Sequence, residues 1–136
     1  MRKINKVILH CSDSDYANHD DIKVIKEWHL ARKPPFNDVG YHYFIRKDGL
    51  IQKGRDISII GAHCKGQNKS SVGICLSGKH KFTEKQFEAL EKLIRGLDIR
   101  LRNKFTLHPH NEFSKKTCPN FSVEDFQLKY FPEWWT

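Results

Sequence analysis

The chain has 136 residues, of which 38% are hydrophobic and 12% aromatic, enough for one compact domain with a buried core. This composition excludes a disordered chain, and no apolar run reaches the length that a membrane-spanning helix needs. The formal net charge is +8, from 24 Lys and Arg against 16 Asp and Glu. Such a balance favours anionic partners, such as nucleic acid or an acidic polymer.

The first residues read MRKINKVILHCSDSD, a basic start followed by the short apolar run VIL. This run is far shorter than the core of a signal peptide, so we expect the protein to be made and folded in the cytoplasm. In that compartment, reduced thiols or metal ligands are expected in place of disulfides. The four cysteines are Cys11, Cys64, Cys75 and Cys118.

The N-terminal third predicts a strand and then a helix. The strand is KVILHC (residues 6–11), where β-branched and apolar residues precede the polar turn SDSD. The helix follows Asp20 or Asp21 as its N-cap, because apolar residues then recur at helical spacing. The prolines of ARKPPF (residues 31–36) cannot continue the helical ladder and end it.

The middle of the chain predicts a β-hairpin over residues 40–55, GYHYFIRKDGLIQKGR. Asp48-Gly49 is a strong turn signal between its two extended arms. Within the first arm, Tyr41 is expected to share a face of the strand with Tyr43, because side chains alternate. SVGICLSG (residues 71–78) is a near-continuous apolar run that suits a central strand.

The C-terminal half contains the clearest helix, over residues 83–101. Thr83 and Gln86 form a capping box before its apolar stripe. KFTLHP (residues 104–109) predicts a last short strand, and Ser122 caps a final short helix. Because strands and helices mix and a hairpin is included, we expect one α/β domain over residues 1–136, with a central mixed β-sheet flanked by helices.

The chain has eight histidines, and most single histidines are surface or satisfied core residues. His10 stands out because it ends an apolar strand, where a side chain can point into a crevice at the edge of the sheet. Cys11 points to the opposite face, so the two residues are not expected to bind one metal together. Cys11 is expected to pack as a small hydrophobe.

The stretch LHPHNEFSKKTCPNF (residues 107–121) holds further candidates. If it is extended, His108 and His110 lie on the same side, and Cys118 follows after a loop. This is not the spacing of a zinc finger, whereas three ligands with an open position would match a catalytic zinc. Spacing alone does not choose between His10 and His63, or between His108 and His110.

Four motifs occur in order and together resemble one family. They are VILHCSDS, DVGYHYFIRKDGLIQKGR, GAHCKGQNKSSVGICLSG and HPHNEFSKKTCPNF. They look like those of the type-2 N-acetylmuramoyl-L-alanine amidases, in the subtype of the phage lysozymes, whose fold is similar to that of peptidoglycan-recognition proteins. The resemblance covers residues 4 to about 121.

The resemblance implies that His10, His110 and Cys118 bind one Zn²⁺ ion and that Tyr41 and Lys116 are catalytic. It further implies that a loop lining the substrate groove contributes two residues, His63 and Asn68. His108 and Lys115 are expected to be neighbours of the site rather than members of it.

The implied reaction is hydrolysis of the amide between N-acetylmuramic acid and L-alanine in peptidoglycan or muropeptides. We expect an endolysin-like enzyme that reaches the cell wall after release from the cell. A non-catalytic peptidoglycan-binding module and a cytoplasmic recycling amidase are the alternatives. No nucleic-acid motif accompanies the positive charge, so no nucleic-acid partner is expected. Some phage relatives also bind a polymerase, but no residue here identifies a protein partner.

Overall fold

The computed structural model describes residues 1–135 and contains a five-stranded sheet in the order β3-β2-β4-β1-β5. Four strands run parallel to one another: β1 (Lys6–Cys11), β2 (Tyr43–Ile45), β4 (Ser71–Leu76) and β5 (Thr106–Pro109). β3 (Ile51–Lys53) pairs antiparallel with β2. The predicted α/β domain with a central mixed sheet is therefore confirmed.

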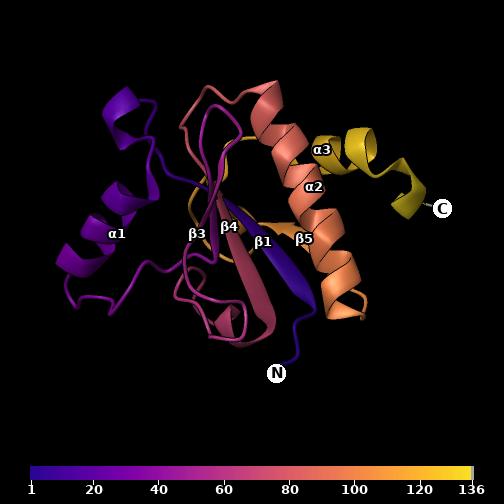
Figure 1. The fold of residues 1–136 in the computed structure, drawn as a ribbon, viewed down its shortest axis with the longest axis horizontal. Helices are drawn as coiled ribbons and strands as arrows, with labels where there is room; N and C mark the ends of the chain where they lie inside the picture. Colours follow the sequence, from indigo (N-terminus) through magenta and orange to yellow (C-terminus); the bar gives the residue numbers. More distant parts are fainter. Residues whose placement is uncertain (136) are drawn as a thin grey trace.

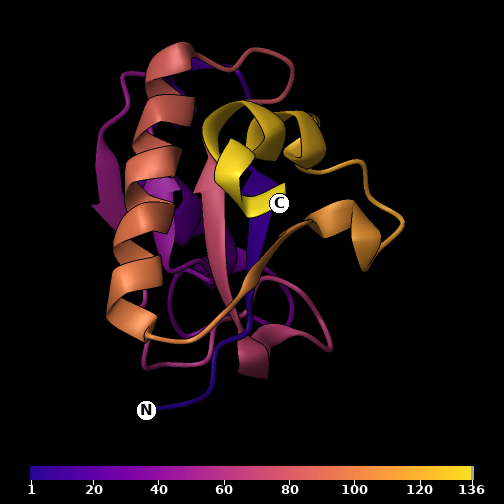
Figure 2. The same ribbon diagram turned by 90° about the vertical axis from the view of Figure 1, so that its right-hand side faces the viewer.

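Helices cover both faces of this sheet, as the two ribbon views show (Figures 1 and 2). α1 (Ile22–Ala31) lies on one side, and α2 (Glu84–Leu101) and α3 (Val123–Tyr130) lie on the other. Within residues 1–135, no helix combines the length and the apolar character that crossing a membrane requires.

The main core lies between the sheet and α2 with α3. In β4, Val72, Ile74 and Leu76 point into this core, where they meet Leu90 of α2, and all four are fully buried. Cys75 faces the other way, into a smaller apolar cluster beneath α1. β4 lies at the centre of the sheet with every residue buried, as its apolar sequence predicts.

The predicted helix starts are confirmed at each N-cap. The Asp21 side chain accepts the backbone N–H of Lys23 at 2.8 Å, and this settles the choice between Asp20 and Asp21. Thr83 and Gln86 form both hydrogen bonds of a capping box at the start of α2. The Ser122 hydroxyl accepts the backbone N–H of Asp125 at the start of α3. Local side-chain signals therefore define where the helices begin.

The hairpin is shorter than the sequence predicts. Its strands β2 and β3 have three residues each, and the turn between them contains Gly49 with φ of +86°. Tyr41 therefore lies before β2, and the predicted alternation does not extend to it. Tyr41 packs on the cluster beneath α1, whereas Tyr43 packs on the opposite core, so the expectation of a shared face is wrong.

Candidate active site

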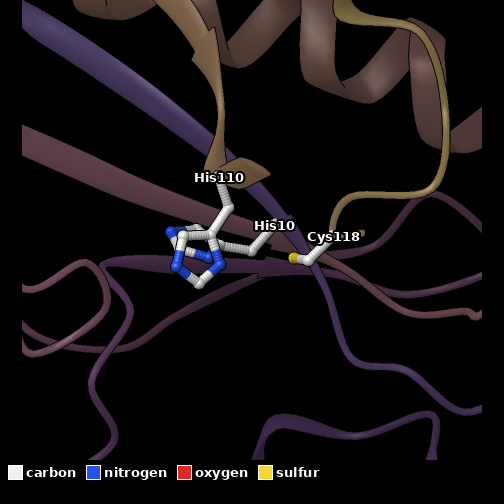
Figure 3. A group of neighbouring side chains, drawn as sticks. All are labelled: His10, His110 and Cys118. Atoms are coloured by element: carbon white, nitrogen blue, oxygen red, sulfur yellow. The ribbon is translucent and has the colours of Figure 1, made fainter. Parts of the chain in front are cut away.

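Three side chains with metal-ligating atoms meet at the carboxyl edge of the parallel strands. One potential ligand atom each from His10, His110 and Cys118 lies within 4.8 Å of the other two. Figure 3 shows the two imidazoles side by side, with the Cys118 sulfur approaching from a separate loop. His10 meets His110 and Cys118, which lie at least 100 positions further along the chain, because β1 and β5 are neighbours in the sheet.

His10 is the buried member of this group, with 1% of its surface exposed. It follows Leu9 in β1, and Leu9 points into the core below α2, so the alternation of the strand turns His10 toward the opposite face. Its Nε2 lies 2.8 Å from Nδ1 of His63. Its own Nδ1 is buried and has no hydrogen-bond partner among residues 1–135. Burial lowers the pKa of His10, which favours the neutral imidazole that a metal binds.

The end of β5 separates the two histidines of the HPH motif. The strand stops at Pro109, and His110 begins a single 3₁₀ turn (His110–Glu112), so the extended geometry that would align the histidines does not persist. His110 stacks against His10, with ring centroids 4.5 Å apart. His108 instead contacts the Glu112 carboxylate at 2.8 Å and the Thr106 hydroxyl at 2.6 Å. His108 thus lies outside the three-residue group.

Cys118 is attached to the sheet through backbone contacts. The backbone N–H of Cys11 donates to the Cys118 sulfur at 3.1 Å, and the backbone N–H of Asn111 donates to the Cys118 carbonyl at 2.9 Å. The second contact joins the loop of Cys118 to the turn of His110. The Cys11 thiol and burial raise the pKa of Cys118 above its usual range in the metal-free protein. A bound cation would reverse this effect, because metal coordination deprotonates a thiol.

A cavity of about 570 Å³ opens beside these three residues. Its walls include all four of the other predicted site residues and one of the three ligand candidates: Tyr41, His63, Asn68, Lys116 and His110. Its cationic lining residues are Arg32, Lys65 and Lys116, and no acidic side chain of the described chain lines it. The cavity is therefore suited to an anionic ligand.

Tyr41 lies between the candidate ligands and the wall formed by α1. Its ring centroid is 5.0 Å from that of His10 and 5.3 Å from that of His29. Burial raises the pKa of Tyr41 well above its ordinary value, so the phenol keeps its proton at neutral pH. The side chain therefore lines the edge of the cavity as a neutral phenol, with the buried Cys75 thiol as a hydrogen-bond partner.

Two adjacent lysines differ in their placement. Lys116 lines the cavity, and its charge acts on both His10 and His110, where it lowers their pKa. Both lysines are exposed, but Lys115 lies outside the cavity lining. The turn between them and His110 is tightened by the Ser114 hydroxyl, which accepts the backbone N–H of Lys116 at 3.2 Å.

His63 and Asn68 belong to a single loop that enters the cavity wall. The side-chain oxygen Oδ1 of Asn68 accepts the backbone N–H groups of His63 and Cys64, at 3.0 and 2.9 Å. Asn68 therefore fixes the shape of this loop in addition to facing the cavity. Burial lowers the pKa of His63 to about 3, with a further contribution from nearby His42, so this imidazole is neutral at physiological pH.

The wall formed by α1 and the segment after it is absent from the sequence-based prediction. His29, Arg32 and Phe36 line the cavity there, and the Arg32 guanidinium lies 4.1 Å from the centre of the Phe36 ring. His29 accepts the backbone N–H of Gly40 at 2.7 Å. Helical periodicity places His29 as an alternative to Trp28 on the apolar stripe, and only the tertiary fold reveals that it faces a cavity.

Comparison with known proteins identifies the class. A family model described as N-acetylmuramoyl-L-alanine amidase matches residues 1–121. The endolysin of Klebsiella phage KP32 is 31% identical over 142 residues, which cover 98% of this chain and 87% of that protein.

Solved structures agree with this result. N-acetylmuramoyl-L-alanine amidase LysC from Clostridium intestinale superposes with a TM-score of 0.83 at 28% identity, covering 94% of this chain and 85% of LysC. A variant of Drosophila PGRP-LB in complex with tracheal cytotoxin superposes with a TM-score of 0.81 at 25% identity, covering 96% of this chain and 83% of that one.

These matches establish a peptidoglycan amidase fold whose carboxyl edge presents the site described above. The chain belongs to the N-acetylmuramoyl-L-alanine amidase family and is an enzyme of the phage-endolysin type. The resemblance inferred from the four motifs is thereby confirmed.

Proposed function

We propose that the chain binds one Zn²⁺ ion through His10, His110 and Cys118 and hydrolyses the amide between N-acetylmuramic acid and L-alanine. The observation that carries the metal is the convergence of three ligand atoms within 4.8 Å, together with the buried and unpartnered Nδ1 of His10. A buried polar atom without a partner is costly, and a metal ion would satisfy it.

The donor set fits zinc. Two neutral imidazoles and one thiolate are ligands that Zn²⁺ prefers, and with the ion they would carry a net charge of about +1. When bound there, zinc supplies Lewis acidity, which polarises a carbonyl and lowers the pKa of water to roughly 7. The remaining steps depend on side chains of the cavity wall.

Lys116 is proposed to stabilise the negative charge that develops on the scissile carbonyl oxygen. Its position in the cavity wall, close enough to influence both candidate histidine ligands, supports this role. Donors aimed at a developing oxyanion contribute on the order of 3 kcal/mol in other hydrolases.

Tyr41 is proposed to donate a hydrogen bond to the attacking water or to the leaving amide nitrogen. Its protonated phenol beside His10 supports this role. In the complete reaction water adds across the C–N bond, which yields a carboxylate on the lactyl group and a free amino group on L-alanine. The nitrogen must gain a proton as the bond breaks, and Tyr41 is proposed to assist that transfer.

Peptidoglycan or a soluble muropeptide is the proposed ligand of the cavity. Muropeptide stems carry carboxylates, which the cations Arg32, Lys65 and Lys116 can attract. Tracheal cytotoxin, the ligand in the related PGRP-LB structure, supports a ligand of this class. His63 and Asn68 are proposed to line the part of the groove opposite α1.

We assign residues 1–136 to a single catalytic domain that acts on the cell wall after release, as expected of an endolysin. The presence of Cys118 favours catalysis over a purely binding role, because the third ligand is retained.

Mass spectrometry of digested peptidoglycan tests the assignment directly. New amino groups on L-alanine support an amidase, whereas binding without cleavage indicates a recognition module. Cleavage of soluble muropeptides but not of intact sacculi indicates recycling.

The metal assignment is tested by a matched pair of variants. Cys118→Ala should lose stoichiometric zinc and activity, whereas His108→Ala should keep both, because the His108 imidazole hydrogen-bonds Thr106 and Glu112 outside the three-residue group. Elemental analysis of the purified proteins gives the zinc content. Full activity in chelator-treated protein, or loss of zinc from His108→Ala alone, would overturn the assignment.

A further inference from the structure

A chain of hydrogen bonds runs from the main chain to His10 through two side chains. The Ser71 hydroxyl lies 2.7 Å from the Gln67 carbonyl oxygen and 3.3 Å from Nε2 of His63. Nδ1 of His63 in turn lies 2.8 Å from Nε2 of His10. Ser71 is fully buried and His10 almost so, whereas His63 between them also lines the cavity.

The direction of each bond in this chain is determined by its first member. A carbonyl oxygen can only accept, so the single hydroxyl proton of Ser71 is committed to Gln67. Toward His63 the hydroxyl can then only accept, and Nε2 of His63 must carry the proton. A neutral imidazole has one donor and one acceptor, which leaves Nδ1 of His63 as the acceptor.

The proton on His63 also determines the tautomer of His10. Because Nδ1 of His63 accepts, Nε2 of His10 must donate, and the lone pair of a neutral His10 then lies on Nδ1. This is the nitrogen that is buried without a partner. We propose that Ser71 and His63 are positioning residues that hold His10 in the tautomer whose Nδ1 binds the metal.

The His63 ring fits a slot made by two glycines. A Cβ on Gly73 would lie 2.5 to 2.7 Å from three atoms of this ring, and a Cβ on Gly61 would lie 2.8 Å from its Cδ2. Real Cβ contacts are longer, so the absence of side chains at these positions is what admits the imidazole. The loop that carries His63 is held by Asn68, whose side chain accepts the His63 backbone N–H.

This arrangement gives His63 a role beyond lining the groove. Both of its ring nitrogens are engaged inside the protein, one by Ser71 and one by His10. The partner of a metal-binding histidine typically fixes the ring orientation and the tautomer, and its loss weakens metal affinity by about 10- to 100-fold. The inference rests on the zinc site of the proposed function, and it adds which nitrogen binds and what selects it.

The unaltered protein provides the first test, which does not depend on any variant folding. Long-range ¹H–¹⁵N correlation of the imidazoles should show His10 protonated at Nε2 in metal-free protein. After loading with ¹¹³Cd in place of zinc, coupling should appear to Nδ1 of His10. A proton on Nδ1 in the metal-free protein, or metal coupling to Nε2, overturns the inference.

Variants provide the second test, read as zinc affinity in competition with a chelator. His63→Leu should bind zinc about 10- to 100-fold more weakly, and Ser71→Ala should show a smaller loss. His63→Asn should recover much of the affinity, because its Oδ1 replaces Nδ1 as the acceptor. His108→Leu is the matched control and should bind as the unaltered protein does. Unchanged affinity in His63→Leu contradicts the inference.

The zinc site and the positioning role of His63 and Ser71 can be tested separately. If the unaltered protein binds no zinc, or if Cys118→Ala keeps it, the proposed metal site is wrong. If zinc depends on Cys118 but couples to Nε2 of His10, the site stands and only the role of His63 and Ser71 falls.

Discussion

The two faces of the central sheet are built from different chemistry. The face below α2 and α3 is hydrocarbon, with Leu9 of β1 and Ile74 of β4 fully buried in it. The face below α1 buries histidines, and His10 and His42 are at most 1% exposed. Leu9 and His10 are consecutive, so the alternation of one strand supplies both faces. One face is packed hydrocarbon, and the other holds polar side chains, including those of the proposed metal site.

Hydrogen bonds allow this small domain to bury reactive side chains. Each buried histidine on the α1 face is held by groups of the protein. His42, for example, accepts the Gly73 N–H at 3.0 Å and donates to the Ile59 carbonyl at 2.8 Å. Buried polar groups are tolerated when they are hydrogen-bonded, and the apolar face offsets their desolvation cost. Substitutions on the two faces should therefore have separable effects.

Leu90→Ala should produce the largest effect, and on stability alone. Leu90 is fully buried at the centre of the apolar face, so its truncation leaves a cavity and should cost about 4 kcal/mol of unfolding free energy. Urea denaturation measures the loss. The kcat of the remaining folded protein should be unchanged at low temperature. A fall in kcat without a change in stability would mean that the two faces are not separable.

Lys116→Ala should show the opposite pattern. It removes the proposed partner of the developing oxyanion, so kcat should fall by roughly 10²- to 10³-fold, or about 3 kcal/mol of barrier. Zinc content and unfolding free energy should be retained, because the side chain lines a cavity rather than the core. Lys115→Ala, at the exposed neighbouring position, is the control and should turn over normally. Equal kcat values for the two variants would remove Lys116 from the mechanism.

Much of the apolar face follows from local sequence signals. Periodicity and caps locate α2 from Thr83, and the apolar run of β4 indicates its central place. These signals suffice because apolar packing is non-directional and tolerates small errors in register or length. The hairpin arms are an exception, since the regular strand begins only at Tyr43, after a bend at His42, and Tyr41 lines the cavity instead.

The polar face is harder to predict because it depends on contacts between distant segments. Sequence spacing alone does not decide whether His10 or His63, and whether His108 or His110, is the metal ligand. The family motifs decide both choices. The structure shows why spacing alone fails. His63 is within hydrogen-bond distance of His10 although 53 positions separate them. The backbone changes from strand at Pro109 to a 3₁₀ turn at His110, so His108 and His110 do not share a face. His29 and Arg32 reach the cavity only through the packing of α1.

His42 should make the polar face acid-sensitive. Burial lowers its pKa from 6.5 to about 4. The unfolded chain therefore binds a proton more readily than the folded protein, and stability falls as pH drops below the unfolded value. Between about pH 7.5 and pH 5 this group alone should cost about 2 kcal/mol. Urea titrations of metal-free protein at both pH values measure the change.

The matched variant for this effect is His42→Asn. Its side-chain oxygen can still accept the Gly73 N–H, but it does not titrate in this range. Stability should therefore fall less steeply with acid in His42→Asn than in the unaltered protein, by about the same 2 kcal/mol. Parallel curves for the two proteins would show that acid sensitivity arises elsewhere on the molecule.

Gly96→Ala should give the smallest effect, and it should be favourable. Gly96 lies inside α2, and a Cβ built there meets no atom within 4 Å. Alanine is favoured over glycine in a helix interior by up to about 1 kcal/mol, because the unfolded chain loses less freedom. The gain belongs to the apolar side of the molecule, so unfolding free energy should rise while zinc affinity and kcat stay constant.

Gly73→Ala provides the counterpart on the polar face. Its Cβ would displace the His63 ring, and zinc affinity should fall. If Gly96→Ala and Gly73→Ala changed zinc affinity to the same extent, the two faces would not have separate effects on stability and metal binding.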